Sequence, residues 1–237
     1  MKSFSITCNA DRMNKCLELS KQLCLNNTVI QSPNGHTDPE VQRRGSQIIE
    51  KGLSCRGNFA CMIGHLMAMS EFLKTQDELC FIFEDDVRFH KDFNSYIEKI
   101  ERYMNETPDV DVVSLGFVNI PFGATTVYDN IEIIENTYVS NPYGTQCYMI
   151  RRRHAKKLVD FFSVDDIYSV YQDRFIADYT IFATDDKLKC NRTSLKFPIV
   201  IEDLSEQSII GNNNKPNLLN ILDKDMFLFG PDILMTT

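Results

Sequence analysis

The stretch that decides the fold is Leu79-Cys80-Phe81-Ile82-Phe83-Glu84-Asp85-Asp86-Val87-Arg88-Phe89. Five apolar residues lead directly into three consecutive carboxylates, and an apolar residue follows at once. A continuous apolar run of this length is typical of a strand buried on both faces, as in the sheet of an α/β protein. Ligands bind at the carboxyl edge of such a sheet, so Glu84, Asp85 and Asp86 mark a candidate site.

The three acids have no use in packing, because they repel one another and are costly to bury without a partner. Hard oxygen ligands at this position suit Mg²⁺ or Mn²⁺ that also holds a substrate phosphate. The alternation of an extended chain places Glu84 and Asp86 on one side and Asp85 on the other. The alternative is that the acids merely open an exposed turn, which is common after strands.

Length and composition predict one domain over residues 1–237, in which residues 210–237 form a C-terminal extension. Hydrophobic residues make up 43% of the chain, which supports a full core. The net charge of −8 argues against electrostatic binding to nucleic acid or to an anionic membrane surface. The eight cysteines include no CxxC pair, so we expect no zinc ribbon and a reducing compartment.

The ends and apolar runs of the chain bear on its location. The first residues lack an apolar segment of signal-peptide length. No stretch approaches the roughly 18 apolar residues of a membrane span. We therefore expect a cytoplasmic protein with no transmembrane segment, for which a viral or bacterial origin would fit. Nothing in the sequence indicates an oligomeric state.

The opening of the chain has the pattern of an α/β nucleotide-binding half. Residues 4–8 predict a short strand, residues 9–12 a polar turn, and the residues that follow a helix. The turn lies at the carboxyl end of the strand, so Asn9, Asp11 and Arg12 are candidate nucleotide contacts. A helix cap is the simpler interpretation of Asn9 or Asp11.

A long loop, with a short helix near residues 46–51, is expected over residues 31–57, where arginines 43, 44 and 56 could meet a diphosphate or remain solvated. Asn58 then predicts the cap of a helix with an apolar stripe. One face of this helix is unusually small around Gly64, so we expect another element to pack closely there. His65 lies beside Gly64.

Further elements follow the acidic stretch. We expect a helix over residues 92–104, strands over 109–116 and 144–150, a hairpin or loop over 119–141, a helix from 151, and a last strand over 196–201. Asp178 begins a short apolar helical segment. No internal repeat, GxGxxG or Walker A pattern occurs.

Several of these stretches resemble glycosyltransferase family 25, the lipopolysaccharide and procollagen galactosyltransferase-type enzymes. Residues 57–66 (GNFACMIGHL) are similar to the family's Gly-Cys-x-x-Ser-His helix, residues 83–89 (FEDDVRF) to its Leu-Glu-Asp-Asp-Val metal motif, and residues 144–150 (GTQCYMI) to its Gly-Thr-x-Ala-Tyr-x-Ile strand. Residues 6–12 and 198–209 resemble its opening and closing segments. Ala60, Gly64 and Glu202 depart from the family's usual Gly, Ser and Gln.

The resemblance implies a GT-A type fold, with a mixed central sheet flanked by helices, that binds a nucleotide sugar. It implies a metal-dependent, inverting transfer of a hexose, galactose or glucose, from a UDP-sugar to a hydroxyl of a glycan or protein acceptor. Asp86 and Glu84 would hold Mn²⁺ or Mg²⁺ in a DxD-like manner. Asn9, Arg12, His65, Asp85 and Glu84 would contact the donor.

Inversion needs a group that takes the proton of the acceptor hydroxyl. By its position relative to the family's motifs, Asp178 is the first candidate for this base, with Asp166 and Glu202 after it, although a helix cap is the simpler role for Asp178. Two other functions stay open. Acids at a strand end also serve metal-dependent phosphoryl or nucleotidyl transfer, and the chain could be a non-catalytic module that binds sugar nucleotides.

Overall fold

The computed structural model of the chain describes residues 1–50, 56–117, 121, 123–135, 144–162, 177–182 and 188–203. Ten strands in these ranges form one mixed sheet, in the order β2-β1-β3-β8-β5-β9-β7-β6, and β10 joins it by pairing with β4 and β5. The strands are β1 Lys2–Thr7, β2 Asn26–Gln31, β3 Leu79–Glu84, β4 Val87–Phe89, β5 Val112–Gly116, β6 Thr125–Tyr128, β7 Ile131–Glu135, β8 Cys147–Arg151, β9 Arg192–Leu195 and β10 Val200–Glu202.

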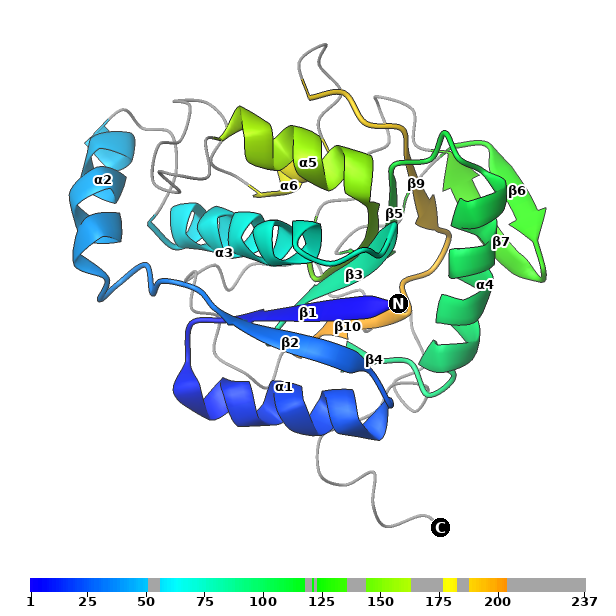
Figure 1. Cartoon of the computed structure of the whole chain (residues 1–237), viewed down its shortest axis with the longest axis horizontal. Helices are drawn as coiled ribbons and strands as arrows, with labels where there is room; N and C mark the ends of the chain where they lie inside the picture. The colour runs from blue at the N-terminus through cyan, green and yellow to red at the C-terminus, as the bar shows by residue number, and fades with distance from the viewer. Residues whose placement is uncertain are drawn as a thin grey trace.

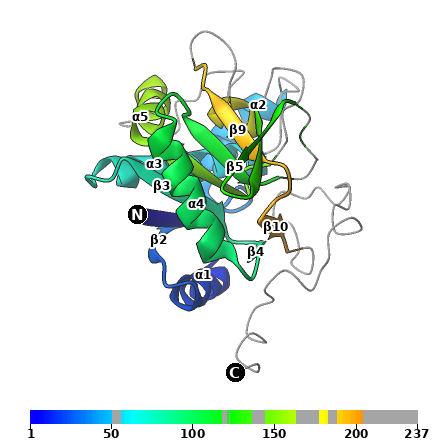
Figure 2. The same cartoon turned by 90° about the vertical axis from the view of Figure 1, so that its right-hand side faces the viewer.

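Helices cover both faces of this sheet, so the mixed α/β architecture expected from the sequence is confirmed. The helices are α1 Ala10–Gln22, α2 Pro39–Glu50, α3 Arg56–Leu73, α4 Phe93–Glu106, α5 Arg152–Phe161 and α6 Ala177–Ile181. Figures 1 and 2 show α1 and α5 on opposite sides of the strands. No helix in the described ranges is both long and apolar enough to cross a bilayer.

Strand β3 lies between the two hydrophobic cores. Cys80 and Ile82 pack into the core that contains α3 and α5, and Phe81 and Phe83 pack into the core that contains α4. Strand β3 pairs parallel with β1, which pairs parallel with β2. The carboxyl ends of these three strands therefore meet at one edge of the sheet, where Glu84 ends β3. On its other side β3 pairs antiparallel with β8.

Helix α3 packs closely on the sheet because Gly64 has no side chain. A Cβ atom at this position would lie 2.6 Å from Cγ2 of Ile6 in β1 and 2.9 Å from Cβ of Ser32. The close contact expected at this small face is thus present. Asn58 does not cap the helix, as the sequence had suggested, because α3 already begins at Arg56.

The loop expected over residues 31–57 is shorter than predicted, because the helix expected near residues 46–51 begins earlier and forms α2 from Pro39 to Glu50. Asp38 caps this helix by accepting hydrogen bonds from the amides of Glu40 and Val41, both at 3.0 Å. Pro39 occupies its first position, where a missing amide proton costs nothing. Asp-Pro-Glu was therefore a helix start signal. Nearby arginines have protein partners: Arg43 and Arg44 pair with Glu40, and Arg56 hydrogen-bonds Gln42.

The last strand, expected over residues 196–201, is correct only at its end, because β10 begins at Val200. The chain forms β9 before this segment and β10 at its end, and Lys196–Ile199 separates them. Proline has no amide proton for a strand ladder, and the residue beside Pro198, Phe197, has 47% of its surface exposed. Strand β9 pairs with β5 and β7, whereas β10 pairs with β4 and β5.

Candidate active site

A pocket with a cavity volume of about 80 Å³ opens at the carboxyl ends of β1, β2 and β3. The three acids of the Glu84–Asp86 stretch lie in its wall. The opposite wall comes from the first turns of α3, with Gly57, Ala60 and Cys61, and Arg12 of α1 also lines it. The sheet thus brings the sequence-predicted acids to a concave site, as expected for the carboxyl edge of parallel strands.

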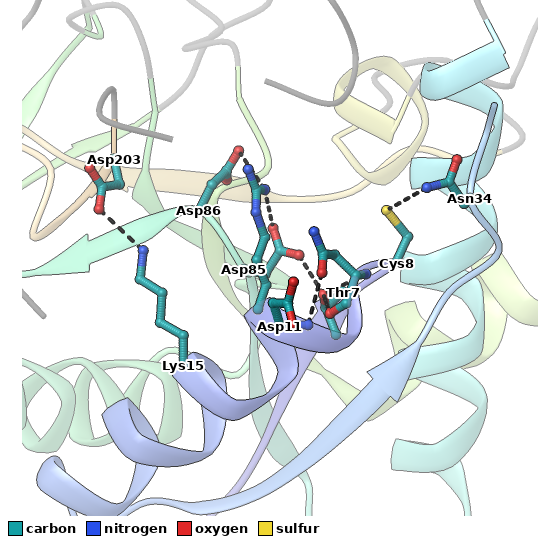
Figure 3. Close-up of polar contacts among 10 residues, drawn as sticks. Thr7, Cys8, Asp11, Lys15, Asn34, Asp85, Asp86 and Asp203 are labelled. Atoms are coloured by element: carbon teal, nitrogen blue, oxygen red, sulfur yellow. Dashed lines mark hydrogen bonds and ion pairs between the residues drawn. The ribbon is translucent and has the colours of Figure 1, made fainter. Parts of the chain in front are cut away.

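Asp85 is held by α1 and β1. Its Oδ2 accepts a hydrogen bond of 2.5 Å from the Thr7 hydroxyl, and its Oδ1 lies 2.9 Å from Nη1 of Arg12. Figure 3 shows Thr7 and Asp85 facing one another. Burial raises the pKa of Asp85, while Thr7 and Arg12 oppose that rise. Asp85 therefore ties β3 to the opening turn of the chain.

Asp86 carries the surplus negative charge of the pocket. Its Oδ2 lies 3.9 Å from Nη1 of Arg12, and 17% of its side chain is exposed. Burial, together with the neighbouring charges of Glu84, Asp85 and Glu202, raises the pKa of Asp86 to about 7. Repulsion between carboxylates is relieved by a divalent cation, and carboxylate oxygens are the ligands that Mg²⁺ and Mn²⁺ prefer. The residues present therefore fit such an ion.

The side chain of Glu84 contacts α3 and the segment that enters β8. The hydroxyl of Thr145 donates a hydrogen bond of 2.7 Å to its Oε1, and Nε2 of His65 lies 3.5 Å from the same atom. His65 is fully buried, and its Nδ1 lies 2.9 Å from the hydroxyl of Tyr148. His65 thus contacts Glu84 from inside the core.

Asp178 lies next to this group, in the first turn of α6. Its Oδ2 accepts a hydrogen bond of 3.1 Å from the amide of Gly144. Burial raises the pKa of Asp178, and the charge of Glu84 adds to the rise. A carboxylate with a raised pKa takes up a proton more readily at neutral pH. Asp166, the second candidate base, lies outside the described residues.

The third candidate base, Glu202, ends β10 opposite Val87 and contributes negative charge to the surroundings of Asp86. Its neighbour Asp203 is buried and pairs with Lys15 at 3.2 Å and with Arg88. Figure 3 shows the Lys15 contact. The amide of Asp203 donates to the carbonyl of Asp86 at 2.6 Å, which fixes the acidic turn against β10.

Asn9 caps α1, as the simpler interpretation held. Its Oδ1 accepts a hydrogen bond of 2.8 Å from the amide of Asp11, and its own amide donates to the Thr7 hydroxyl at 3.1 Å. Four of the described candidates line the pocket wall, namely Arg12, Glu84, Asp85 and Asp86. The others lie outside that wall, namely Asn9, His65, Asp178 and Glu202.

Sequence reasoning missed the two threonines that orient the acids, Thr7 and Thr145, and it missed Asp203. A signal existed for each, because all three are polar residues directly at the end of a strand or in the segment that enters one. Tyr148 was also missed, since a buried strand tyrosine looks like an ordinary core residue.

The chain is similar to three solved structures at low identity. A197 from STIV is 16% identical with a TM-score of 0.45, covering 84% of this chain and 83% of that one. A glycosyltransferase involved in the glycosylation of the major capsid of PBCV-1 is 11% identical with a TM-score of 0.42, covering 88% and 94%. Mannose-1-phosphate geranyltransferase from Thermus thermophilus is 10% identical with a TM-score of 0.38, covering 90% and 77%.

A search of curated protein sequences finds no match. The sequence model of one protein family does match, over residues 41–176, which is more than half of the chain. This range contains α3, the acidic end of β3 and all of β8, which are the elements around Glu84. The chain belongs to glycosyltransferase family 25 (LPS biosynthesis protein).

Proposed function

We propose that this glycosyltransferase binds a UDP-hexose, with galactose or glucose as the sugar, together with Mn²⁺ or Mg²⁺ in the pocket at the end of β3. The hexose passes with inversion to a hydroxyl of a glycan or protein acceptor. The observation that carries the proposal is the set of three carboxylates in one pocket wall, with the pKa of Asp86 raised by burial and by its acidic neighbours.

Asp86 and Glu84 are the residues proposed to hold the metal ion. Asp85 is less suited, because Thr7 and Arg12 already occupy both of its oxygens. A bound divalent ion would neutralise the charge of the departing nucleoside diphosphate. We assign Asp85 to the donor side of the pocket, where it keeps Arg12 and the opening turn in place.

The opening turn is the proposed contact for the nucleotide. It ends at the N-terminus of α1, where the helix dipole favours an anion. Arg12 lines the pocket and provides positive charge there. Asn9 shapes this turn through its cap, and His65 acts on the donor through Glu84.

Asp178 is the proposed base for the acceptor hydroxyl. Its support is its place beside Glu84 and the upward shift of its pKa by burial. The acceptor proton would move to a carboxylate oxygen of Asp178 as the hydroxyl attacks the anomeric carbon, and the bond from that carbon to the diphosphate oxygen would break. Asp166 and Glu202 are the alternatives for this role.

Release of nucleotide from a panel of UDP-, GDP- and CMP-sugars, with Mn²⁺ or with EDTA, tests the proposal. The wild-type protein should release UDP from a UDP-hexose only with the metal ion. Asp86→Asn should lose this activity, whereas Glu71→Gln should keep it, since that acid lies on α3 with 43% of its side chain exposed. If no donor releases its nucleotide, the proposed catalysis is refuted. If EDTA leaves the release of UDP unchanged, the proposed dependence on a metal ion is refuted.

A further inference from the structure

Three side chains of different chemistry converge beside the acidic cluster, namely Cys61, His65 and Glu84. One ligand atom from each lies within 4.8 Å of the other two. Cys61 and His65 are one helical turn apart on α3, so their side chains share a face. Glu84 meets that face from the end of β3.

The state of the His65 ring gives a second, independent observation. The ring is fully buried, and its Nδ1 lies 2.9 Å from the hydroxyl of Tyr148. Its Nε2 is buried without a hydrogen-bond partner among the described residues, 3.5 Å from Oε1 of Glu84. Buried polar atoms are nearly always satisfied, so a ring nitrogen of this kind needs an explanation.

Metal-binding histidines have the same arrangement. One ring nitrogen donates its proton to a neighbouring oxygen, which leaves the lone pair of the other nitrogen for the ion. A proton on Nδ1 donated to Tyr148 would leave the Nε2 lone pair directed into the cluster. The Thr145 hydroxyl orients Glu84 in the same way, through a hydrogen bond of 2.7 Å to its Oε1.

We infer that Cys61, His65 and Glu84 form a Zn²⁺ site beside the proposed Mn²⁺ or Mg²⁺ site. A thiolate, an imidazole and a carboxylate are the ligands that zinc takes, whereas Mg²⁺ and Mn²⁺ prefer oxygen alone. Cys61 and Glu84 also line the pocket, so a fourth coordination position would face it. The two sites share Glu84, so bound Zn²⁺ would withdraw a ligand from the ion at Asp86, a consequence that rests on the proposed function.

Protection of Cys61 from alkylation tests the inference on the wild-type protein without any sugar nucleotide. Cleavage after lysine and arginine places Cys61 alone in the peptide of residues 57–74 and the exposed Cys24 alone in that of residues 22–43. At Zn²⁺ about ten times its Kd, the free site falls to about one tenth. Iodoacetamide should then modify Cys61 about tenfold more slowly, EDTA should restore the rate, and Cys24 should react equally fast with and without Zn²⁺.

Co²⁺ binding provides the matched comparison of variants, because a thiolate ligand gives Co²⁺ an intense near-ultraviolet charge-transfer band. Cys24→Ser should keep the band and Cys61→Ser should lose it, with circular dichroism confirming that both variants fold. An unchanged alkylation rate of Cys61 under Zn²⁺, or a band that persists in Cys61→Ser, would overturn the inference. Failure of donor turnover would leave both readouts intact, so the two proposals fail separately.

Discussion

The raised pKa of Asp86 makes the stability of the protein depend on pH. This pKa rises from the ordinary 3.8 to about 7, first through burial and then through Glu84, Asp85 and Glu202. At pH values between these two pKa values, Asp86 is protonated in more of the folded protein than of the unfolded chain. The free energy of unfolding without metal should therefore fall as pH rises through this window, and Asp86→Asn should remove that loss.

The same shift predicts how Mn²⁺ binding depends on pH. A proton on Asp86 must leave before the ion binds, so affinity for Mn²⁺ should be about thirtyfold weaker at about pH 5.5 than at about pH 8. Counting free Mn²⁺ by electron paramagnetic resonance measures this dependence, with Asp86→Asn as the control in which it is largely lost. Equal affinity at both pH values would contradict the raised pKa.

Replacement of Asp178 distinguishes a role as the general base from a role in binding the donor. Asp178→Asn should lower kcat by about 10²–10⁴-fold and leave UDP affinity within about threefold, since general base catalysis contributes an effect of that size. Steady-state kinetics with calorimetric UDP titration checks both values. Asp160→Asn, an acid of α5 whose side chain is 60% exposed, serves as the control. An unchanged kcat in Asp178→Asn would move the role to Glu202 or Asp166.

At the residue scale, the acids of the site could be predicted because they are adjacent in the chain and end an apolar strand. Their partners could not be predicted from local pattern. Thr7 lies 78 residues from Asp85, and Thr145 lies 61 residues from Glu84, so only the pairing of strands brings these hydroxyls to the acids. The family resemblance indicated the segment of Thr145, but it said nothing of its bond to Glu84.

Among the elements, α3 depends on a residue without a side chain. Gly64→Ala would place a methyl group 2.6 Å from Cγ2 of Ile6 and 2.9 Å from Cβ of Ser32, so these side chains or α3 itself must shift. We expect the free energy of unfolding to fall by about 1–3 kcal/mol, measured by urea denaturation. Ser70→Ala on the same helix should change it little, because the Ser70 hydroxyl bonds only the carbonyl of Leu66 among the contacts described. A Gly64→Ala variant as stable as wild type would refute this close packing.

The end of α3 is held by the start of α5. The guanidinium of Arg152 donates to the carbonyls of Leu73 at 3.1 Å, Thr75 at 2.7 Å and Asp77 at 2.8 Å. These carbonyls include ones left unpaired at a helix C-terminus, which favour a cation. The basic start of α5 therefore has a structural role at Arg152.

Arg152→Ala should lower the free energy of unfolding by about 2–3 kcal/mol, because it removes several charged hydrogen bonds at once. Arg153→Ala is the matched control, since Arg153 is 51% exposed and pairs with Asp111 at the surface. Such exposed pairs contribute less than about 1 kcal/mol. Chemical denaturation of both variants measures the difference, and equal losses would contradict the role of Arg152.

Helices and strands were predicted correctly where the hydrophobic pattern extends over many residues. The prediction failed where cap and turn residues set the ends of an element. The apolar run of β3 and the stripe of α3 identified their elements correctly. The start of helix α2 was missed although Asp38 and Pro39 form a start signal, because the surrounding glycines and polar residues resemble a loop. Only the end of this helix was predicted. Strand β9 was not predicted, and the last strand was started too early because Phe197 continues the apolar pattern, whereas it is exposed between β9 and β10.

At the scale of the whole molecule, the end of β3 connects both sides of the site. Asp85 contacts α1 and β1, whereas Glu84 contacts α3 and the segment that enters β8. The short acidic segment is therefore fixed from both sides of the pocket. The order of strands places β1, β3 and β8 side by side, which makes these contacts possible. The sequence motifs indicated the family, while the strand order had to come from the structure.

The most direct test of the central claim is a calorimetric titration of UDP into the wild-type protein, Asp86→Asn and Glu71→Gln, with Mn²⁺ and with EDTA. We predict that wild type and Glu71→Gln bind UDP with Mn²⁺, and that EDTA or Asp86→Asn weakens binding by at least about tenfold, a loss of about 1.4 kcal/mol. Equal UDP affinity in EDTA, or in Asp86→Asn, would contradict a metal-bridged nucleotide at the acidic end of β3.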